Sequence, residues 1–332
     1  MLNRRRRLAA VVAVAALTGS LAACSSTGGK QDTSSSAGGS GGQVANTPKF
    51  TIAMVTHETS GDTFWDKIRA GAEAAAAKDN IDLKYSNDPD PGKQATLVQQ
   101  ATDSKVDGIA TTLATPDALK SSVQAADKAG IPVVAFNSGI DQYVDVGAMQ
   151  YFGSDENLAG ETAGKRITQN GGKKPLCVIQ AAGSVALEAR CAGVKKEAPG
   201  TTNLQVNGND DNAVVSTLTA KLQQDKSIDT IVTLGAPIAV DALQAIKSTN
   251  SHAKLVTFDL NAEVAKDIQS GDVDFSIDQQ PYLQGYEAVD SLWLYLTNRN
   301  TMGGGLPVLT GPSFVDKTNI DKIVTYAEKG TR

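Results

Sequence analysis

Short apolar segments alternate with amphipathic segments along the chain, and this alternation restricts the possible folds more than any other feature. Strands are expected at residues 50–55, 106–111 and 131–136, and the last run is apolar throughout and rich in β-branched residues. Helices are expected after Asp62 and from Pro116, two residue types that favour helix starts. Continuous apolar runs of this kind indicate a parallel sheet that is covered on both faces.

The alternation resumes after Gly153. The expected elements are helices at 154–167, 186–197, 213–224, 237–247, 263–269 and 281–297, and strands at 176–179, 204–206, 230–234 and 255–258. These units are too many for one sheet, so the sequence predicts an α/β fold with two doubly wound domains. In such sheets, ligands bind beyond the carboxyl ends of the strands.

The first 47 residues have the organisation of an export signal and a tether. Arg4–Arg7 precede an apolar run, too short to span a bilayer, and Leu21-Ala22-Ala23-Cys24 follows. This tetrapeptide resembles the lipobox of bacterial lipoproteins, in which the Cys becomes the lipidated first residue; a plain signal peptide is the alternative. We expect a signal peptide over 1–23, lipid on Cys24 and a flexible Gly/Ser-rich linker over 24–47. The protein would then be anchored to the cell membrane, facing the periplasm or the cell exterior.

Charge excludes several classes of partner. Without the leader, 27 basic side chains stand against 36 acidic ones, a formal charge of −9. A charge of this sign argues against binding to nucleic acid or to an anionic membrane surface, so the lipid would provide the only membrane attachment.

The cysteines and histidines are few. If Cys24 carries lipid, Cys177 and Cys191 remain as an even pair, for which an exported protein favours a disulfide over two buried free thiols. Only His57 and His252 are then left, so no Cys/His metal site can be assembled, and neither a metal nor another cofactor is expected.

Six segments in a fixed order carry a family resemblance. They are Gly61-Asp62-Thr63-Phe64-Trp65, Val106-Asp107-Gly108-Ile109, Gly130-Ile131-Pro132-Val133-Val134, Glu188-Ala189-Arg190, Thr257-Phe258-Asp259 and Asp278-Gln279-Gln280-Pro281. Together they resemble the type I periplasmic binding proteins, the ribose/galactose-binding type of solute-binding protein that serves ABC importers. The resemblance implies two Rossmann-like lobes joined by a three-segment hinge. One lobe would hold residues 48–153 and 280–308, and the other 154–279 and 309–332.

The resemblance also implies a ligand between the lobes. The candidate ligand-binding residues are His57, Asp62, Phe64, Trp65, Asn137, Arg190, Asn209, Asp259 and Gln279. Such a set suits a sugar or polyol, because polar groups bind hydroxyls, Arg190 offers a rigid fork of donors, and aromatic rings cover C–H faces. Asn137 stands where the family often has an Asp, and Gly235-Ala236-Pro237 where many relatives have Asn-Asp, so the identity of the sugar does not carry over.

Most candidates also have a purely structural interpretation. Asp62 would then only cap a helix, and Arg190 would pair with Glu188 or Glu197. Phe64 and Trp65 would be core residues, Asn209 a turn residue, and His57 a surface loop residue. Asp259 and Gln279 are the strongest candidates, because they end strands at the expected cleft.

The chain shows no catalytic motif in a suitable context. It lacks a phosphate-binding G-x-x-x-x-G-K-[ST] loop and a Ser-His-Asp arrangement on a nucleophile elbow. The expected function is therefore non-catalytic capture of a small sugar or polyol, which a separate ABC permease and ATPase would import. The alternatives are another small solute, such as a nucleoside or a furanone-type signal, and a lipid-anchored receptor for a membrane sensor.

Overall fold

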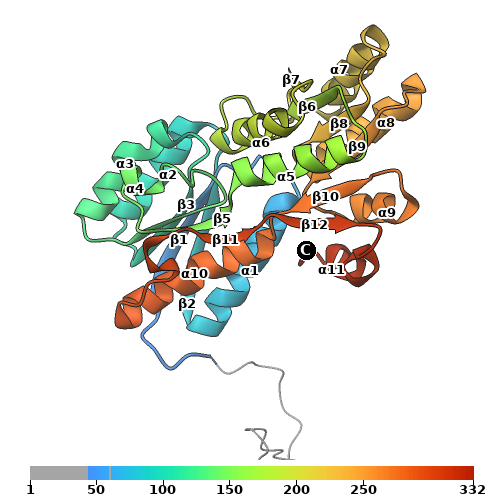
Figure 1. Cartoon of the computed structure of the whole chain (residues 1–332). Helices are drawn as coiled ribbons and strands as arrows, with labels where there is room; N and C mark the ends of the chain where they lie inside the picture. Colours follow the sequence, from blue (N-terminus) through green and yellow to red (C-terminus); the bar gives the residue numbers. More distant parts are fainter. Residues whose placement is uncertain (1–43, 60) are drawn as a thin grey trace, which may run out of the picture. The chain divides into compact units, whose positions relative to one another are not determined.

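The computed structural model describes residues 44–59 and 61–332, and two six-stranded sheets form its framework (Figure 1). The predicted lipidation site Cys24 and the signal peptide lie outside the described residues. No helix in this described part of the chain is long and apolar enough to cross a membrane.

The first sheet is parallel throughout. Its strands, in spatial order, are β11 (Val308–Gly311), β5 (Gln150–Ser154), β4 (Val133–Phe136), β3 (Gly108–Thr112), β1 (Phe50–Thr56) and β2 (Ile81–Asn87). Apolar side chains of α1 (Phe64–Asp79) and α10 (Pro281–Asn298) pack on one face, and those of α2 (Pro91–Asp103) and α3 (Pro116–Lys128) pack on the other. Burial on both faces explains the continuous apolar runs in the sequence.

The second sheet repeats this order. Its strands are β12 (Ser313–Asp316), β10 (Phe275–Asp278), β9 (Lys254–Phe258), β8 (Thr230–Thr233), β6 (Pro175–Ile179) and β7 (Thr202–Gln205), and only β12 runs antiparallel. The helices α5 (Glu156–Gln169) and α6 (Val185–Glu197) cover one face, whereas α7 (Asp211–Gln224), α8 (Ala236–Thr249) and α9 (Ala262–Ser270) cover the other. The short helices α4 (Tyr143–Val146) and α11 (Val324–Glu328) complete the α-helices of the described residues. The predicted α/β fold with two doubly wound sheets is confirmed.

The chain passes between the two sheets after β5, after β10 and after β11. The last passage lies later than predicted, because residues 309–311 still pair with β5 in the first sheet, whereas the sequence placed them in the second lobe.

Two pairs of helices pack closely at glycines. A Cβ on Gly285 of α10 would overlap the carbonyl of Ile68 in α1, and a Cβ on Gly160 of α5 would overlap the carbonyl of Arg190 in α6. Glycine at these positions therefore allows the helices to approach closely.

Several elements were missed in the sequence. They are β2, α2, α4, β5, β10, β11, β12 and α11. Two helix starts also differ from the expected ones: Thr63 precedes α1, which was expected to begin after Asp62, and Asp155 caps α5, which was expected to begin at residue 154. The missed strands are short or lie at sheet edges, where half-buried residues give no continuous apolar run.

The disulfide prediction is confirmed. Cys177 in β6 and Cys191 in α6 are bonded, both are fully buried, and their Cα atoms are 5.8 Å apart. The bond ties α6 to the sheet at the residue that follows Arg190.

Candidate functional site

A large cavity lies where the carboxyl ends of strands from both sheets meet. Its volume is about 920 Å³, and its walls include residues that follow β1, β4, β6, β8 and β9. All nine predicted ligand-binding residues line it: His57, Asp62, Phe64, Trp65, Asn137, Arg190, Asn209, Asp259 and Gln279. The structure thus brings the candidates together, and their contact with a ligand stays a prediction.

Asn137 and Asp259 occupy equivalent places in the two sheets. Asn137 directly follows β4 and Asp259 directly follows β9, and both adopt the left-handed region, with φ of 65° and 64°. Each backbone N–H donates 2.9 Å to a carbonyl of the neighbouring strand, from Asn137 to Phe152 and from Asp259 to Ile277. Asn and Asp tolerate this backbone conformation better than other residues with a side chain. The same local geometry therefore aims one polar side chain from each sheet at the cavity.

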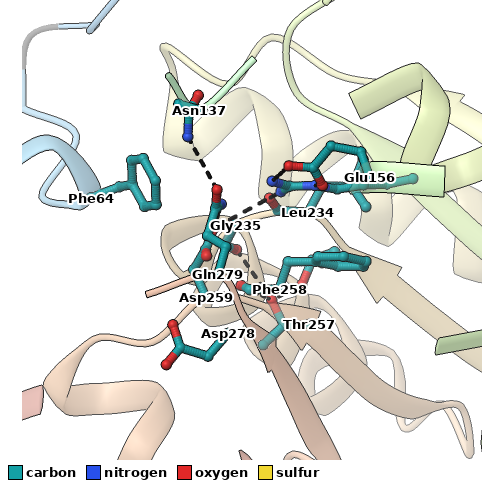
Figure 2. A network of polar contacts seen from close by, with 12 residues as sticks. Phe64, Asn137, Glu156, Leu234, Gly235, Thr257, Phe258, Asp259, Asp278 and Gln279 are labelled. Atoms are coloured by element: carbon teal, nitrogen blue, oxygen red, sulfur yellow. Dashed lines mark hydrogen bonds and ion pairs between the residues drawn. The ribbon is translucent and has the colours of Figure 1, made fainter. Parts of the chain in front are cut away.

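Gln279 joins these two side chains (Figure 2). Its Oε1 accepts from Asn137 Nδ2 at 3.1 Å, and its Nε2 donates to Asp259 Oδ2 at 3.0 Å. Gln284 Nε2 donates to Gln279 Oε1 at 3.0 Å, and Asn137 Nδ2 also donates to Gln284 Oε1 at 3.2 Å. Asn137 has thus used its donors within the protein, so Gln279 and Asn137 hold the strand ends together.

Asp259 retains a free oxygen. Its Oδ1 is buried and has no hydrogen-bond partner in the described structure, although a buried carboxylate oxygen without a partner is costly. Burial raises the pKa of Asp259 to about 7, against the opposing effect of Arg190, whose Nη1 lies 3.9 Å from Oδ2. A ligand hydroxyl that donates to Oδ1 would satisfy this oxygen.

Arg190 is held by a residue that the sequence did not indicate. Its Nε and Nη2 donate to the two carboxylate oxygens of Glu156, at 2.5 and 3.0 Å, and its Nη1 donates to the Leu234 carbonyl at 3.0 Å. Both side chains are buried, with 4% and 3% exposed. Burial opposes the charge on Arg190, but Glu156 raises the arginine pKa overall, so Arg190 stays protonated. The alternative partners considered in the sequence, Glu188 and Glu197, are not its partners.

His57 belongs to a hydrogen-bond chain that defines its tautomer. Thr112 Oγ1 lies 3.0 Å from the donor Gln94 Nε2, 3.2 Å from the backbone nitrogen of His57, and 2.7 Å from His57 Nδ1. Because the hydroxyl already accepts two N–H groups, its own hydrogen is directed to Nδ1, which leaves the ring proton on Nε2. Burial lowers the pKa of His57 to about 4. His57 is therefore a neutral donor in the cavity wall.

The remaining candidates form the aromatic wall and the rim. Phe64 and Trp65 meet edge to face at 5.2 Å, and Trp65 is buried, belonging to the core of the first sheet as well as to the cavity wall. Asp62 Oδ1 accepts from the backbone N–H of Phe64 at 3.0 Å, and burial raises the pKa of Asp62. Asn209 is exposed and donates through its backbone to Asn207, as in the predicted turn.

Several cavity-wall side chains escaped the sequence reasoning, among them Gln94, Ser138 and Gln180. Gln180 follows β6 directly, so the general expectation that ligands lie beyond strand ends could have found it. Gln94 lies in α2, which was not predicted, and no local signal marks it.

Comparison with known proteins agrees with this architecture. A family model described as a periplasmic binding protein domain matches residues 52–300. The xylose/arabinose-binding protein of Sulfolobus acidocaldarius is 26% identical over 306 residues, which cover 84% of this chain and 74% of that protein. The ribose import binding protein of Bacillus subtilis is 24% identical over 253 residues, 74% of this chain and 81% of that protein.

A solved structure is more similar still. The crystal structure of a carbohydrate transporter from Acidothermus cellulolyticus 11B in complex with myo-inositol is 57% identical, covers 86% of this chain and 100% of that chain, and superposes with a TM-score of 0.85. The chain therefore belongs to the periplasmic binding protein domain family, whose members are exported solute-binding proteins and not enzymes, as the sequence predicted.

Proposed function

We propose that this protein captures a small, neutral polyol or sugar for an ABC importer, and that a cyclic polyol of the myo-inositol type is its ligand. The observation that carries the proposal is the buried, unpartnered Oδ1 of Asp259 in the cavity wall. An acceptor of this kind favours a ligand that donates, and hydroxyl groups donate and accept. The myo-inositol in the 57% identical transporter is a ligand of this chemistry.

The charges around the cavity favour a neutral ligand. Both oxygens of Glu156 already neutralise Arg190, and Asp259 adds a further carboxyl group. A carboxylate or phosphate on the ligand would have to compete with Glu156 for the guanidinium and would lie near like charge. Such repulsion in a buried site disfavours sugar acids and sugar phosphates.

The two sheets would grip opposite sides of the ligand. Phe64 and Trp65 belong to the first sheet's layers and offer flat surfaces for C–H faces, whereas Arg190 and Asp259 belong to the second. Contacts from both sides give the ligand a higher affinity for a closed state, which is what a hinge-bending capture protein needs. In this proposal the two lobes are residues 48–153 with 280–311, and 154–279 with 312–332, and the hinge consists of the three passages between the sheets.

The remaining parts of the proposal concern the partners. A lipid on Cys24 would hold the protein at the membrane on the linker of residues 24–47, and a separate permease and ATPase would receive the ligand.

A ligand panel tests the proposal. Thermal unfolding and titration calorimetry would use myo-inositol, D-xylose, L-arabinose and D-ribose, with glucuronate, glucose 6-phosphate and adenosine as contrasts. Binding at 100 times the dissociation constant stabilises a protein by about 2.7 kcal/mol, so a true ligand raises the melting temperature measurably. We expect myo-inositol to bind most tightly and the charged sugars not to bind. Tight binding of adenosine or of a charged sugar, with none of the neutral polyols and sugars bound, would overturn the proposal.

A further inference from the structure

One row of residues along the carboxyl edge of the second sheet differs from its counterpart in the first. Val178, Thr233 and Thr257 are paired across β6, β8 and β9. Two residues later on each strand come Gln180, Gly235 and Asp259. This row therefore places a glycine between two polar residues.

In the equivalent row of the first sheet, the middle position is a leucine instead of a glycine. Val55, Thr111 and Ala135 are paired across β1, β3 and β4, and two residues later come His57, Leu113 and Asn137. Leu113 is fully buried and does not line the cavity, whereas Gly235 does. The two rows are thus asymmetric: Gly235 borders the cavity without a side chain, whereas Leu113, at the equivalent position of the first sheet, packs its side chain in the core.

The cavity wall on either side of Gly235 in this row carries two acceptors without partners in the described structure. Asp259 Oδ1 and Gln180 Oε1 are both buried without a hydrogen-bond partner in the described structure, and both residues line the cavity. A Cβ on Gly235 would meet a single neighbouring atom, Gln180 Nε2, at 3.1 Å. The backbone of Gln180 is held in place, because its carbonyl accepts from Gly208 N–H at 3.1 Å.

We propose that Gln180 is a specificity-determining residue of the ligand site, and that Gly235 keeps open a pocket in which the ligand donates hydroxyl groups to both Gln180 and Asp259. Gly235 belongs to the polar network of Figure 2, where its carbonyl accepts from Thr257 Oγ1 at 3.3 Å. The ligand sits over β8 and presents two hydroxyl donors to the second sheet, while the neutral donor His57 faces it from the first. This inference rests on the proposed function and deepens it, because it assigns to one wall of the cavity the residues that distinguish ligands by the positions of their hydroxyl groups.

Calorimetric titration with myo-inositol tests the inference in the full chain. Gln180→Leu removes the acceptor at similar volume and leaves a ligand hydroxyl unpaired, so affinity should fall roughly 10- to 100-fold. Gly235→Ala keeps an extended backbone that any residue adopts, at φ −168°, and should weaken binding by crowding the Gln180 amide and the pocket. Gln224→Leu, an exposed glutamine at the end of α7, is the matched control and should bind as the wild type does.

Ligands that lack one hydroxyl make the test specific. One deoxy-inositol lacks the hydroxyl group that donates to Gln180. The wild type should bind this compound about as weakly as Gln180→Leu binds myo-inositol. Gln180→Leu should bind this compound and myo-inositol with equal affinity. A melting temperature for each variant shows that it is folded. If the wild type binds myo-inositol and folded Gln180→Leu binds it equally well, the inference is wrong and the proposed function stands. If the wild type binds no member of the polyol and sugar panel, the proposed function fails first.

Discussion

The ion pair between Glu156 and Arg190 should be one of the most sensitive points of the second lobe. The two side chains are joined by two hydrogen bonds at 2.5 and 3.0 Å and are almost inaccessible to water. Glu156→Gln removes the charge and keeps the volume, which leaves Asp259, at 3.9 Å, as the nearest carboxylate to the guanidinium. Removing one partner of a buried pair typically costs about 3–5 kcal/mol, because the other charge stays buried without compensation.

The same helix provides a matched control. Glu161 in α5 pairs with Lys196 in α6 at 2.6 Å, but these side chains are 29% and 64% exposed. Glu161→Gln should therefore cost only about 0–1 kcal/mol. Urea unfolding of both variants measures the difference in their free energies of unfolding, provided that this free energy falls with urea concentration at the same slope in both. If Glu156→Gln is no more destabilising than Glu161→Gln, the argument from burial is wrong.

A double variant separates charge burial from packing. Glu156→Leu together with Arg190→Met removes both charges and leaves apolar side chains, so most of the lost stability should return. Ligand affinity should not return, because the guanidinium donors are gone. Arg190→Ala would leave Glu156 buried and unpaired, so this single variant should lower stability as well as affinity.

Two further predictions concern pH and oxidation. Burial raises the pKa of Asp259 to about 7 in the folded protein, from about 3.9 in an unfolded chain, so the folded state binds the extra proton between these values. Asp259 therefore makes the ligand-free protein less stable as pH rises from about 4 to 7, whereas His57, whose pKa burial lowers to about 4, acts in the opposite direction. The wild type should consequently lose more stability than Asp259→Asn over this pH range; identical pH profiles by thermal unfolding would contradict this. The disulfide between Cys177 and Cys191 closes a loop with a sequence separation of 14, so replacing both cysteines by alanine should cost about 3 kcal/mol in urea unfolding, and a loss below about 0.5 kcal/mol would count against this loop-entropy reasoning.

Much of the site could be anticipated because parallel strands end at one edge of a sheet. Once the strands before Asn137 and Asp259 were recognised, the position of both residues at the cavity followed. The helix α2 could not be recognised in the same way, since only Gln94, Val98 and Ala101 of it are buried and its apolar face is narrow. With α2 missed, the support that Gln94 gives to Thr112 and His57 was also missed.

The sequence by itself determined the fold class, the exported family and the disulfide pair, because long buried strands, ordered motifs and an even number of remaining cysteines leave few alternatives. Only the tertiary structure decided which polar atoms have partners. Glu156 stands 34 residues before Arg190 and reaches it through the packing of α5 against α6, and Gln180 flanks Gly235 through strand register. A hydrogen-bond partner depends on distance in space, and no local pattern in a single sequence contains that distance.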